Sequence, residues 1–153
     1  MRDLSLSLVV SSDPGLGKWA RGIRDAVGNL LSTHFDLPGI FADYSAFKCE
    51  YEGGAHPLHA DNVTAAGQPN HTYWRDATAM LYLNDGQRDF DGGRLKFARL
   101  QRELMPKPGL LVGFGCGLDF EHEVTPILRG RRYGIAFWFT RDHKWQEHWQ
   151  LEN

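Results

Sequence analysis

The sequence has little cysteine, no long apolar run and almost no excess charge. Cys49 and Cys116 are its only cysteines, and without a CxxC spacing they indicate neither a disulfide framework nor a structural zinc site. No apolar run approaches the length of a membrane span. A formal net charge of -2 gives no electrostatic reason to expect nucleic acid or an anionic membrane as the main partner. These absences favour a reduced, cytoplasmic globular protein.

The remaining composition is that of an ordinary folded domain. Hydrophobic residues make up 42% and charged residues 24% of the 153 positions. No internal repeat, low-complexity tract or linker divides the chain. We therefore expect a single domain over residues 1–153.

Helical periodicity is confined to one early segment. Apolar side chains recur at helical spacing from residue 17 to 34 and predict an amphipathic helix packed on the outside of the fold. Ahead of it, leucines at positions 4, 6 and 8 alternate with serines, which predicts an opening strand ended by residues 11–15. Residues 35–43, with Pro38 and Gly39, predict a turn-rich connection.

Strand patterns follow the helix almost to the end of the chain. The predicted strands are 44–51, 77–83, 94–97, 103–105, 110–114, 121–124 and 131–140. The long polar loop at 63–76 has the character of a functional lid, and the tail at 141–153 forms either a helical turn or a loose end. One helix followed by short strands separated by turns predicts a mainly β fold, either a sandwich or a jelly-roll barrel.

The segment Pro57-Leu58-His59-Ala60-Asp61-Asn62 carries half of a metal site. In an extended backbone His59 and Asp61 project from the same side of the chain. An imidazole and a carboxylate fill two positions, so a facial site with room for chemistry needs a third ligand. Among the seven histidines, His122 has the best context, because it lies in a strand-like stretch after a glycine-rich turn.

The final predicted strand has two different faces. Tyr133, Ile135, Phe137 and Phe139 make one face bulky, as expected for a core. The other face has a cation, two small residues and an aromatic, which predicts a wall beside a space that side chains do not fill; these residues are Arg132, Gly134, Ala136 and Trp138.

The predicted strand at 77–83 divides in the same way and places hydroxyl groups on its inward face. These belong to Thr78 and Tyr82. A buried Arg132 needs an anionic partner, since an unpaired internal charge is costly. A ligand carboxylate bound by Arg132 and hydrogen-bonded by Tyr82 would meet that need.

Together these residues resemble a known family. The pattern combines His59-x-Asp61, His122 and Arg132 with Tyr82-Leu83-Asn84, Gly92-Gly93, Pro108-Gly109 and Gly130-x-Arg132. It is similar to the iron(II)- and 2-oxoglutarate-dependent dioxygenases of the prolyl hydroxylase type. The stretches PLHADN, YWRDATAMLYLND and GRRYGIAFWFT resemble in particular the catalytic domain of the prolyl 3-hydroxylases (leprecans), and the resemblance runs from about residue 44 to 140.

This resemblance implies a fold and a set of site residues. The implied fold is a double-stranded β-helix (jelly roll, cupin-like) over about 44–140, with helical support over about 17–34. The implied roles are Fe(II) binding by His59, Asp61 and His122; binding of the distal carboxylate of 2-oxoglutarate by Arg132 and Tyr82, with Tyr51 and Thr78 beside it; a pocket wall of Trp138 and Leu95; and a substrate contact by Arg75.

The implied reaction is hydroxylation of an unactivated C–H bond by O2, with 2-oxoglutarate converted to succinate and CO2 and ascorbate as an optional reductant. Related halogenases lack the carboxylate ligand, so Asp61 favours hydroxylation. The implied substrate is a prolyl residue in a peptide or protein. Collagen prolyl 3-hydroxylases carry large extra regions and a secretory signal that this sequence does not show, so their compartment and substrate are not carried over.

Several alternatives stay open at this point. The substrate is alternatively a free amino acid or another small molecule, or the fold serves as a non-catalytic sensing or binding module. Histidine and aspartate also accept other divalent metals. The oligomeric state is left open.

Overall fold

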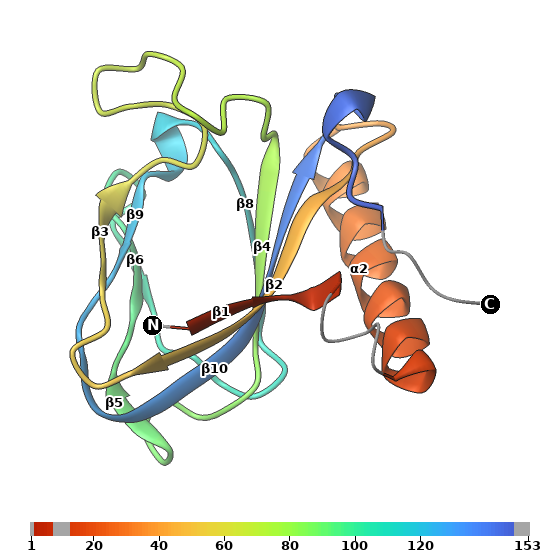
Figure 1. The fold of residues 1–153 in the computed structure, drawn as a ribbon. Helices are drawn as coiled ribbons and strands as arrows, with labels where there is room; N and C mark the ends of the chain where they lie inside the picture. Colours follow the sequence, from red (N-terminus) through yellow and green to blue (C-terminus); the bar gives the residue numbers. More distant parts are fainter. Residues whose placement is uncertain (1, 8–12, 149–153) are drawn as a thin grey trace.

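The computed structural model describes residues 2–7 and 13–148. Two antiparallel sheets face each other, and one helix covers the outer side of the larger sheet (Figure 1). This arrangement confirms the predicted mainly β, jelly-roll fold with an N-terminal helix. Among the described helices, none combines the length and apolar character needed to cross a membrane.

The larger sheet has six strands. Five of them pair in the order β1–β2–β10–β4–β8, and the sixth, β5, pairs with the first part of β10. Its members are β1 (Arg2–Ser5), β2 (Phe41–Tyr51), β4 (Ala77–Tyr82), β5 (Phe90–Gly92), β8 (Leu111–Gly115) and β10 (Ile127–Thr140). The smaller sheet has the order β3–β9–β6–β7 and consists of β3 (His56–His59), β6 (Leu95–Phe97), β7 (Arg102–Leu104) and β9 (His122–Val124). Two short 3-10 helices, η1 (Leu118–Phe120) and η2 (His143–Trp145), follow β8 and β10.

Helix α2 (Pro14–His34) begins three residues earlier than predicted. Asp13 is its N-cap, because the side-chain oxygen accepts hydrogen bonds from the backbone N–H groups of Gly15 (2.8 Å) and Leu16 (3.1 Å). Pro14 then occupies the first turn, where its missing N–H costs nothing. The Asp-Pro-Gly sequence that predicted the end of a strand therefore starts the helix.

The opening strand is shorter than the leucine alternation predicted. β1 ends at Ser5, and Leu6 has helical backbone and is buried in the core that α2 covers. The third leucine of the pattern, Leu8, lies outside the described residues. Burial against the helix has overridden a local pattern of only three residues.

Two other strands start earlier than predicted. β2 begins at Phe41 inside the predicted turn region, because a β-bulge at Asp43 of β2 lets the two strands continue to pair. β10 begins at Ile127 and first pairs with β5, a strand that was not predicted. Gly92 ends β5 at a φ of +77°, and a Cβ there would lie 2.0 Å from the carbonyl oxygen of Pro126, so only glycine fits this close approach.

The two faces of β10 separate the core from the site, as predicted. Ile135, Phe137 and Phe139 pack with α2 in the largest apolar cluster. On the other face, Ala136 and Trp138 meet Tyr82 of β4 between the two sheets. The strand register therefore aims one row of side chains at the helix and the next row at the interior of the jelly roll.

Candidate active site

Three predicted metal ligands meet at one end of the smaller sheet. His59 ends β3 and pairs directly with His122, the first residue of β9. With Asp61, they place one ligand atom each within 4.8 Å of one another. Across residues 2–7 and 13–148, no other group of three or more such ligands is brought together in this way.

The backbone at Asp61 differs from the extended segment that was predicted. β3 stops at His59, and the chain turns so that the N–H groups of Asp61 (3.0 Å) and Asn62 (3.2 Å) both donate to the carbonyl of Cys116. The turn, rather than strand alternation, brings the Asp61 carboxylate to 3.6 Å from Nε2 of His59. Strand alternation therefore predicted that His59 and Asp61 lie together, but with the wrong local geometry.

Both histidines are oriented by the backbone. Nδ1 of His59 lies 2.8 Å from the carbonyl of Pro57, and Nδ1 of His122 lies 3.0 Å from the carbonyl of Phe120. A carbonyl only accepts, so each Nδ1 donates and each Nε2 is left with its lone pair for a metal. Two such nitrogens and one carboxylate on one side are the donor set of a non-haem Fe(II) centre with open positions.

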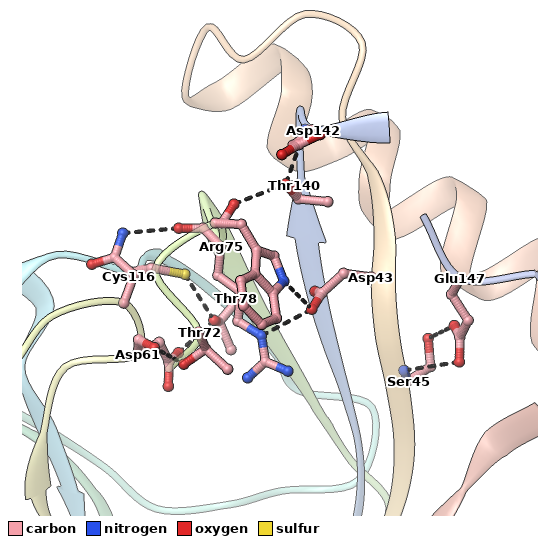
Figure 2. A network of polar contacts seen from close by, with 12 residues as sticks. Asp43, Ser45, Asp61, Thr72, Arg75, Thr78, Cys116, Thr140, Asp142 and Glu147 are labelled. Atoms are coloured by element: carbon pink, nitrogen blue, oxygen red, sulfur yellow. Dashed lines mark hydrogen bonds and ion pairs between the residues drawn. The ribbon is translucent and has the colours of Figure 1, made fainter. Parts of the chain in front are cut away.

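Thr78 fixes the carboxylate of Asp61. Its hydroxyl donates to Oδ2 at 2.5 Å and lies 3.3 Å from the Sγ of Cys116 (Figure 2). The other oxygen, Oδ1, is the one that faces His59. Thr78 was predicted beside 2-oxoglutarate; the structure shows that its hydroxyl donates to the metal ligand.

The titration behaviour of the triad follows from this packing. Burial by itself would raise the pKa of Asp61, but His59, the charge of His122 and the hydrogen bond from Thr78 hold that pKa below its usual range. The nearby Asp61 carboxylate raises the pKa of His59, whereas burial lowers the pKa of His122. One carboxylate thus stays ionised between two imidazoles, which suits a divalent cation.

Behind the triad lies an inner cavity of about 80 Å³ between the two sheets. Its lining includes five residues that were predicted to surround the co-substrate, namely Thr78, Tyr82, Leu95, Arg132 and Trp138. Lys48 and His56 also line it and were not predicted. Burial raises the pKa of Tyr82 to about 12, so its hydroxyl stays protonated and is able to donate.

Tyr51 does not belong to this cavity. It lies at the end of β2, is 46% exposed and is absent from the lining. Alternation along β2 turns Lys48 and Glu50 inward, which puts Tyr51 on the opposite side. The resemblance predicted Tyr51 beside 2-oxoglutarate, whereas the structure gives the inward face of β2 to Lys48 and Glu50.

Arg132 has a partner within the protein. It is 3% exposed, its Nε and Nη2 contact Oε2 of Glu50, and its Nη1 donates to the carbonyl of Gly93 at 3.0 Å. Glu50 is 2% exposed, and its other oxygen lies 2.5 Å from Nε2 of His56. Burial by itself would raise the pKa of Glu50, but His56 and Arg132 lower it below its usual range. The anionic partner predicted to be a ligand is thus already supplied by Glu50.

An outer groove of about 560 Å³ leads to the metal ligands from solvent. Its wall comes from His59, Asp61, the loop at 63–76, Leu118, Glu121 and Trp138. Hydrogen bonds to the carbonyl of Asp61 from Thr72 Oγ1 (2.6 Å) and Asn70 Nδ2 (3.2 Å) tie this loop to the metal-binding turn. The predicted lid is therefore an ordered wall of the groove.

Arg75 lies where the cavity and the groove meet. Its side chain is 15% exposed, its Nε donates to Oδ2 of Asp43 at 3.1 Å, and its guanidinium lies 4.6 Å from the centre of the Trp138 ring. Trp74 donates to the same Asp43 oxygen at 3.0 Å. Arg75 is thus held in place beside the groove by Asp43 and Trp138.

The tail after β10 packs against this corner. The Trp145 ring stacks on Trp74 with centroids 3.6 Å apart, and the carboxylate of Glu147 accepts hydrogen bonds from the N–H (3.2 Å) and hydroxyl (2.8 Å) of Ser45. Of the two forms left open for the tail, its described part, up to residue 148, shows a short helical turn, η2. The pairing of two distant tryptophans had no signal in the sequence.

The chain matches known proteins over most of its length. The model of the 2OG-Fe(II) oxygenase superfamily matches residues 45–140. Prolyl 3-hydroxylase 1 of Homo sapiens is 33% identical over 149 residues, covering 82% of this chain and 20% of that protein. The chain therefore spans about a fifth of the length of this curated relative.

Solved structures match as well. A prolyl-4-hydroxylase from Pseudomonas putida superposes with a TM-score of 0.62 at 26% identity, covering 83% of this chain and 66% of that chain. A prolyl hydroxylase from Trichoplax adhaerens, in complex with a hypoxia inducible factor peptide fragment, superposes with a TM-score of 0.65 at 20% identity, covering 94% and 64%. The latter shows the fold alone. By its sequence match, its jelly roll and its His-Asp-His triad, this chain belongs to the 2OG-Fe(II) oxygenase superfamily.

Proposed function

We propose that this protein is an Fe(II)- and 2-oxoglutarate-dependent dioxygenase that hydroxylates a prolyl residue of a peptide or protein and releases succinate and CO2. The observation that carries the proposal is the His59-Asp61-His122 triad at the junction of the inner cavity and the outer groove. Resemblance to prolyl 3-hydroxylase 1 and to the P. putida prolyl-4-hydroxylase supports the prolyl substrate.

The residues present fit the cofactor. His59 and His122 each present a neutral Nε2, and Asp61 presents a carboxylate that Thr78 orients. Fe(II) bound there with 2-oxoglutarate and O2 supplies the oxidising chemistry for the hydroxylation.

The protein's own groups position and shield that chemistry. Arg132 and Tyr82 line the cavity and would hold the distal carboxylate of 2-oxoglutarate by charge and by hydrogen bonding. Leu95 and Trp138 give the cavity apolar walls that keep bulk water away from the reacting atoms. In this proposal the residues of the chain therefore bind the co-substrate in its ground state and orient it.

The shape of the outer groove favours a peptide over a small molecule. The groove lies open beside the loop at 63–76, and that loop forms one wall and does not close over the metal ligands. The T. adhaerens relative, with the same fold, is in complex with a peptide fragment. A free amino acid stays the second candidate, and a cytoplasmic location stays a prediction.

The experiment is conversion of 2-oxoglutarate to succinate by the iron-loaded protein, with and without proline-containing peptides. We expect peptides to stimulate succinate formation and to gain one oxygen atom, detected by mass spectrometry. If free proline stimulates turnover and peptides do not, the small-molecule alternative replaces the peptide assignment. If the protein neither binds nor converts 2-oxoglutarate, the proposed function is wrong.

A further inference from the structure

Glu50 and Arg132 form an ion pair that is buried inside the jelly roll. Oε2 of Glu50 contacts both Nε and Nη2 of Arg132, and the two side chains are 2% and 3% exposed. Burial by itself raises the pKa of Glu50, but His56 and Arg132 hold that pKa below its usual range, so the carboxylate is ionised at neutral pH. The buried cation therefore has a counter-ion before any co-substrate enters.

The carboxylate of Glu50 is held from its other side as well. Its Oε1 lies 2.5 Å from Nε2 of His56. Glu50 of β2 pairs directly with Arg132 of β10, so the register of the sheet keeps the two residues side by side. Because both oxygens are engaged, we expect the carboxylate to stay in place when a second anion arrives.

The contacts divide the guanidinium of Arg132 between Glu50 and the cavity. Arg132 lines the inner cavity, whereas Glu50 does not. Glu50 takes one hydrogen each of Nε and Nη2, and the carbonyl of Gly93 accepts one from Nη1 at 3.0 Å. A guanidinium has five N–H groups, so one on Nη1 and one on Nη2 have no partner among the described residues. These two are left for a ligand.

A carboxylate bound there shares its cation with Glu50. In the proposed function Arg132 and Tyr82 hold the distal carboxylate of 2-oxoglutarate, which places two carboxylates around one guanidinium. Like charges that share a low-dielectric site disfavour each other. We infer that Glu50 sets the affinity of the co-substrate site, as an internal competitor whose carboxylate weakens the binding of the distal carboxylate of 2-oxoglutarate.

This inference rests on the proposed function and concerns a residue to which neither the sequence pattern nor the resemblance gave a role. Without co-substrate, Glu50 spares the interior an unpaired cation. With co-substrate, part of the attraction that Arg132 exerts is already balanced. Succinate formation should therefore saturate at a higher 2-oxoglutarate concentration than an unpaired Arg132 would allow.

The test removes the charge of Glu50 and keeps its shape. In Glu50→Gln the side-chain oxygen still accepts from Arg132, whereas Glu50→Asp keeps the charge and shortens the side chain. 2-Oxoglutarate and 2-oxopentanoate, which lacks the distal carboxylate, are titrated calorimetrically into each Mn(II)-loaded protein. We expect Glu50→Gln to tighten 2-oxoglutarate binding about 10- to 100-fold, the size by which a neighbouring like charge disfavours a buried carboxylate.

Three controls separate charge from structure. Binding of 2-oxopentanoate to Glu50→Gln should change less than about threefold, because this keto acid has no distal carboxylate to be repelled. Glu50→Asp should bind 2-oxoglutarate no more tightly than wild type. Glu103→Gln removes an exposed carboxylate that accepts from Nη1 of Arg94 at 2.7 Å and does not line the cavity, so both affinities should stay unchanged.

Four results would overturn the inference. Unchanged or weaker 2-oxoglutarate binding in Glu50→Gln would show that Glu50 does not compete with the ligand. Equal tightening of both keto acids would place the effect away from the distal carboxylate, and equal tightening in Glu50→Asp would assign it to shape. A Glu50→Gln protein that stays unfolded in excess 2-oxoglutarate, as judged by thermal melts, would make Glu50 a structural residue.

The proposed function is tested separately by wild type. In each of these four cases wild type still binds 2-oxoglutarate, and the proposed function stands. Failure of wild type itself to bind 2-oxoglutarate would instead contradict the proposed function.

Discussion

The inner cavity and the outer groove meet at Trp138 and the metal ligands, yet they are built from different parts of the chain. The cavity is lined mostly by strand residues, whose positions follow from sheet register. The groove is lined mostly by the loop at 63–76 and η1, with the tail packed behind it. Under the proposed function, the reaction would take place among strand residues, and the substrate would be recognised by loops that hydrogen bonds hold.

The largest expected effect comes from the inner cavity. Asp61→Ala removes the anionic metal ligand and the acceptor of the Thr78 hydroxyl, so we expect turnover of 2-oxoglutarate to fall to background. Calorimetric titration with Mn(II) should show that metal binding is lost as well. Asp91→Ala, which removes an exposed carboxylate paired with Arg129, should keep both properties, and comparable losses in the two variants would contradict the assignment.

Next comes the buried ion pair beneath the cavity. Arg132→Met leaves Glu50 buried without its cation, and we expect the free energy of unfolding to fall by about 3–5 kcal/mol without ligand. A double variant, Glu50→Leu with Arg132→Met, should recover most of this loss. Arg129→Met breaks an exposed Arg–Asp pair instead and should cost less than about 1 kcal/mol. Urea unfolding measures the free energy of unfolding of Arg132→Met, of the double variant and of Arg129→Met. An Arg132→Met protein as stable as wild type would show that Arg132 and Glu50 are not energetically coupled.

Thr78→Val should have a smaller effect, confined to the metal. Without the 2.5 Å hydrogen bond to Asp61, we expect metal affinity to fall about 10- to 100-fold. Thr78→Ser keeps the hydroxyl and should bind metal nearly as well as wild type. If valine and serine variants bind Mn(II) equally, the hydroxyl does not orient the ligand.

The same ion pair predicts how stability depends on pH. Because the pKa of Glu50 is lowered in the folded protein, its contribution is fully present above the usual glutamate value of 4.5 and is lost as the pH falls through the folded value. Urea midpoints should therefore drop on acidification below 4.5 more steeply for wild type than for the Glu50→Leu, Arg132→Met double variant. Parallel pH profiles would argue against a lowered Glu50 pKa.

The smallest expected effect belongs to the outer groove. Trp145→Ala removes the ring stacked on Trp74 and loosens the corner that holds Arg75. We expect the KM for peptide to rise by roughly threefold to tenfold while the KM for 2-oxoglutarate stays unchanged, the pattern of lost ground-state substrate binding. A change in the KM for 2-oxoglutarate alone would show that groove and cavity are not separate.

The same comparison shows what the sequence was able to predict. His59, Asp61 and His122 were predicted to share a metal site, and the structure brings the three together. The role of Arg132 as an anchor stays a prediction. The faces of β4 and β10 followed from alternation, which needs only the strand itself. The loop at 63–76 was predicted as a lid and not as a wall, and the packing of the tail was not predicted, since contacts such as Glu147 to Ser45 join segments far apart in the chain.

The errors have physical causes of the same kind. Tyr51 was placed beside the co-substrate by the resemblance, but in the structure Lys48 and Glu50 take the inward face of β2, where Arg132 from another strand pairs with Glu50. Asp61 was given an extended backbone because the carbonyl of Cys116 that fixes its turn belongs to a remote segment. Local patterns therefore predicted which residues matter, and tertiary partners decided how they are held.

The most direct test of the account is mass spectrometry of a proline-containing peptide after incubation with the iron-loaded protein and 2-oxoglutarate under isotopically labelled dioxygen. The account predicts one labelled oxygen atom on a prolyl residue, with succinate formed in equal amount, and neither product with Asp61→Ala. Metal and 2-oxoglutarate binding without labelled peptide would contradict the peptidyl assignment. Labelled peptide from Asp61→Ala would contradict the metal centre itself.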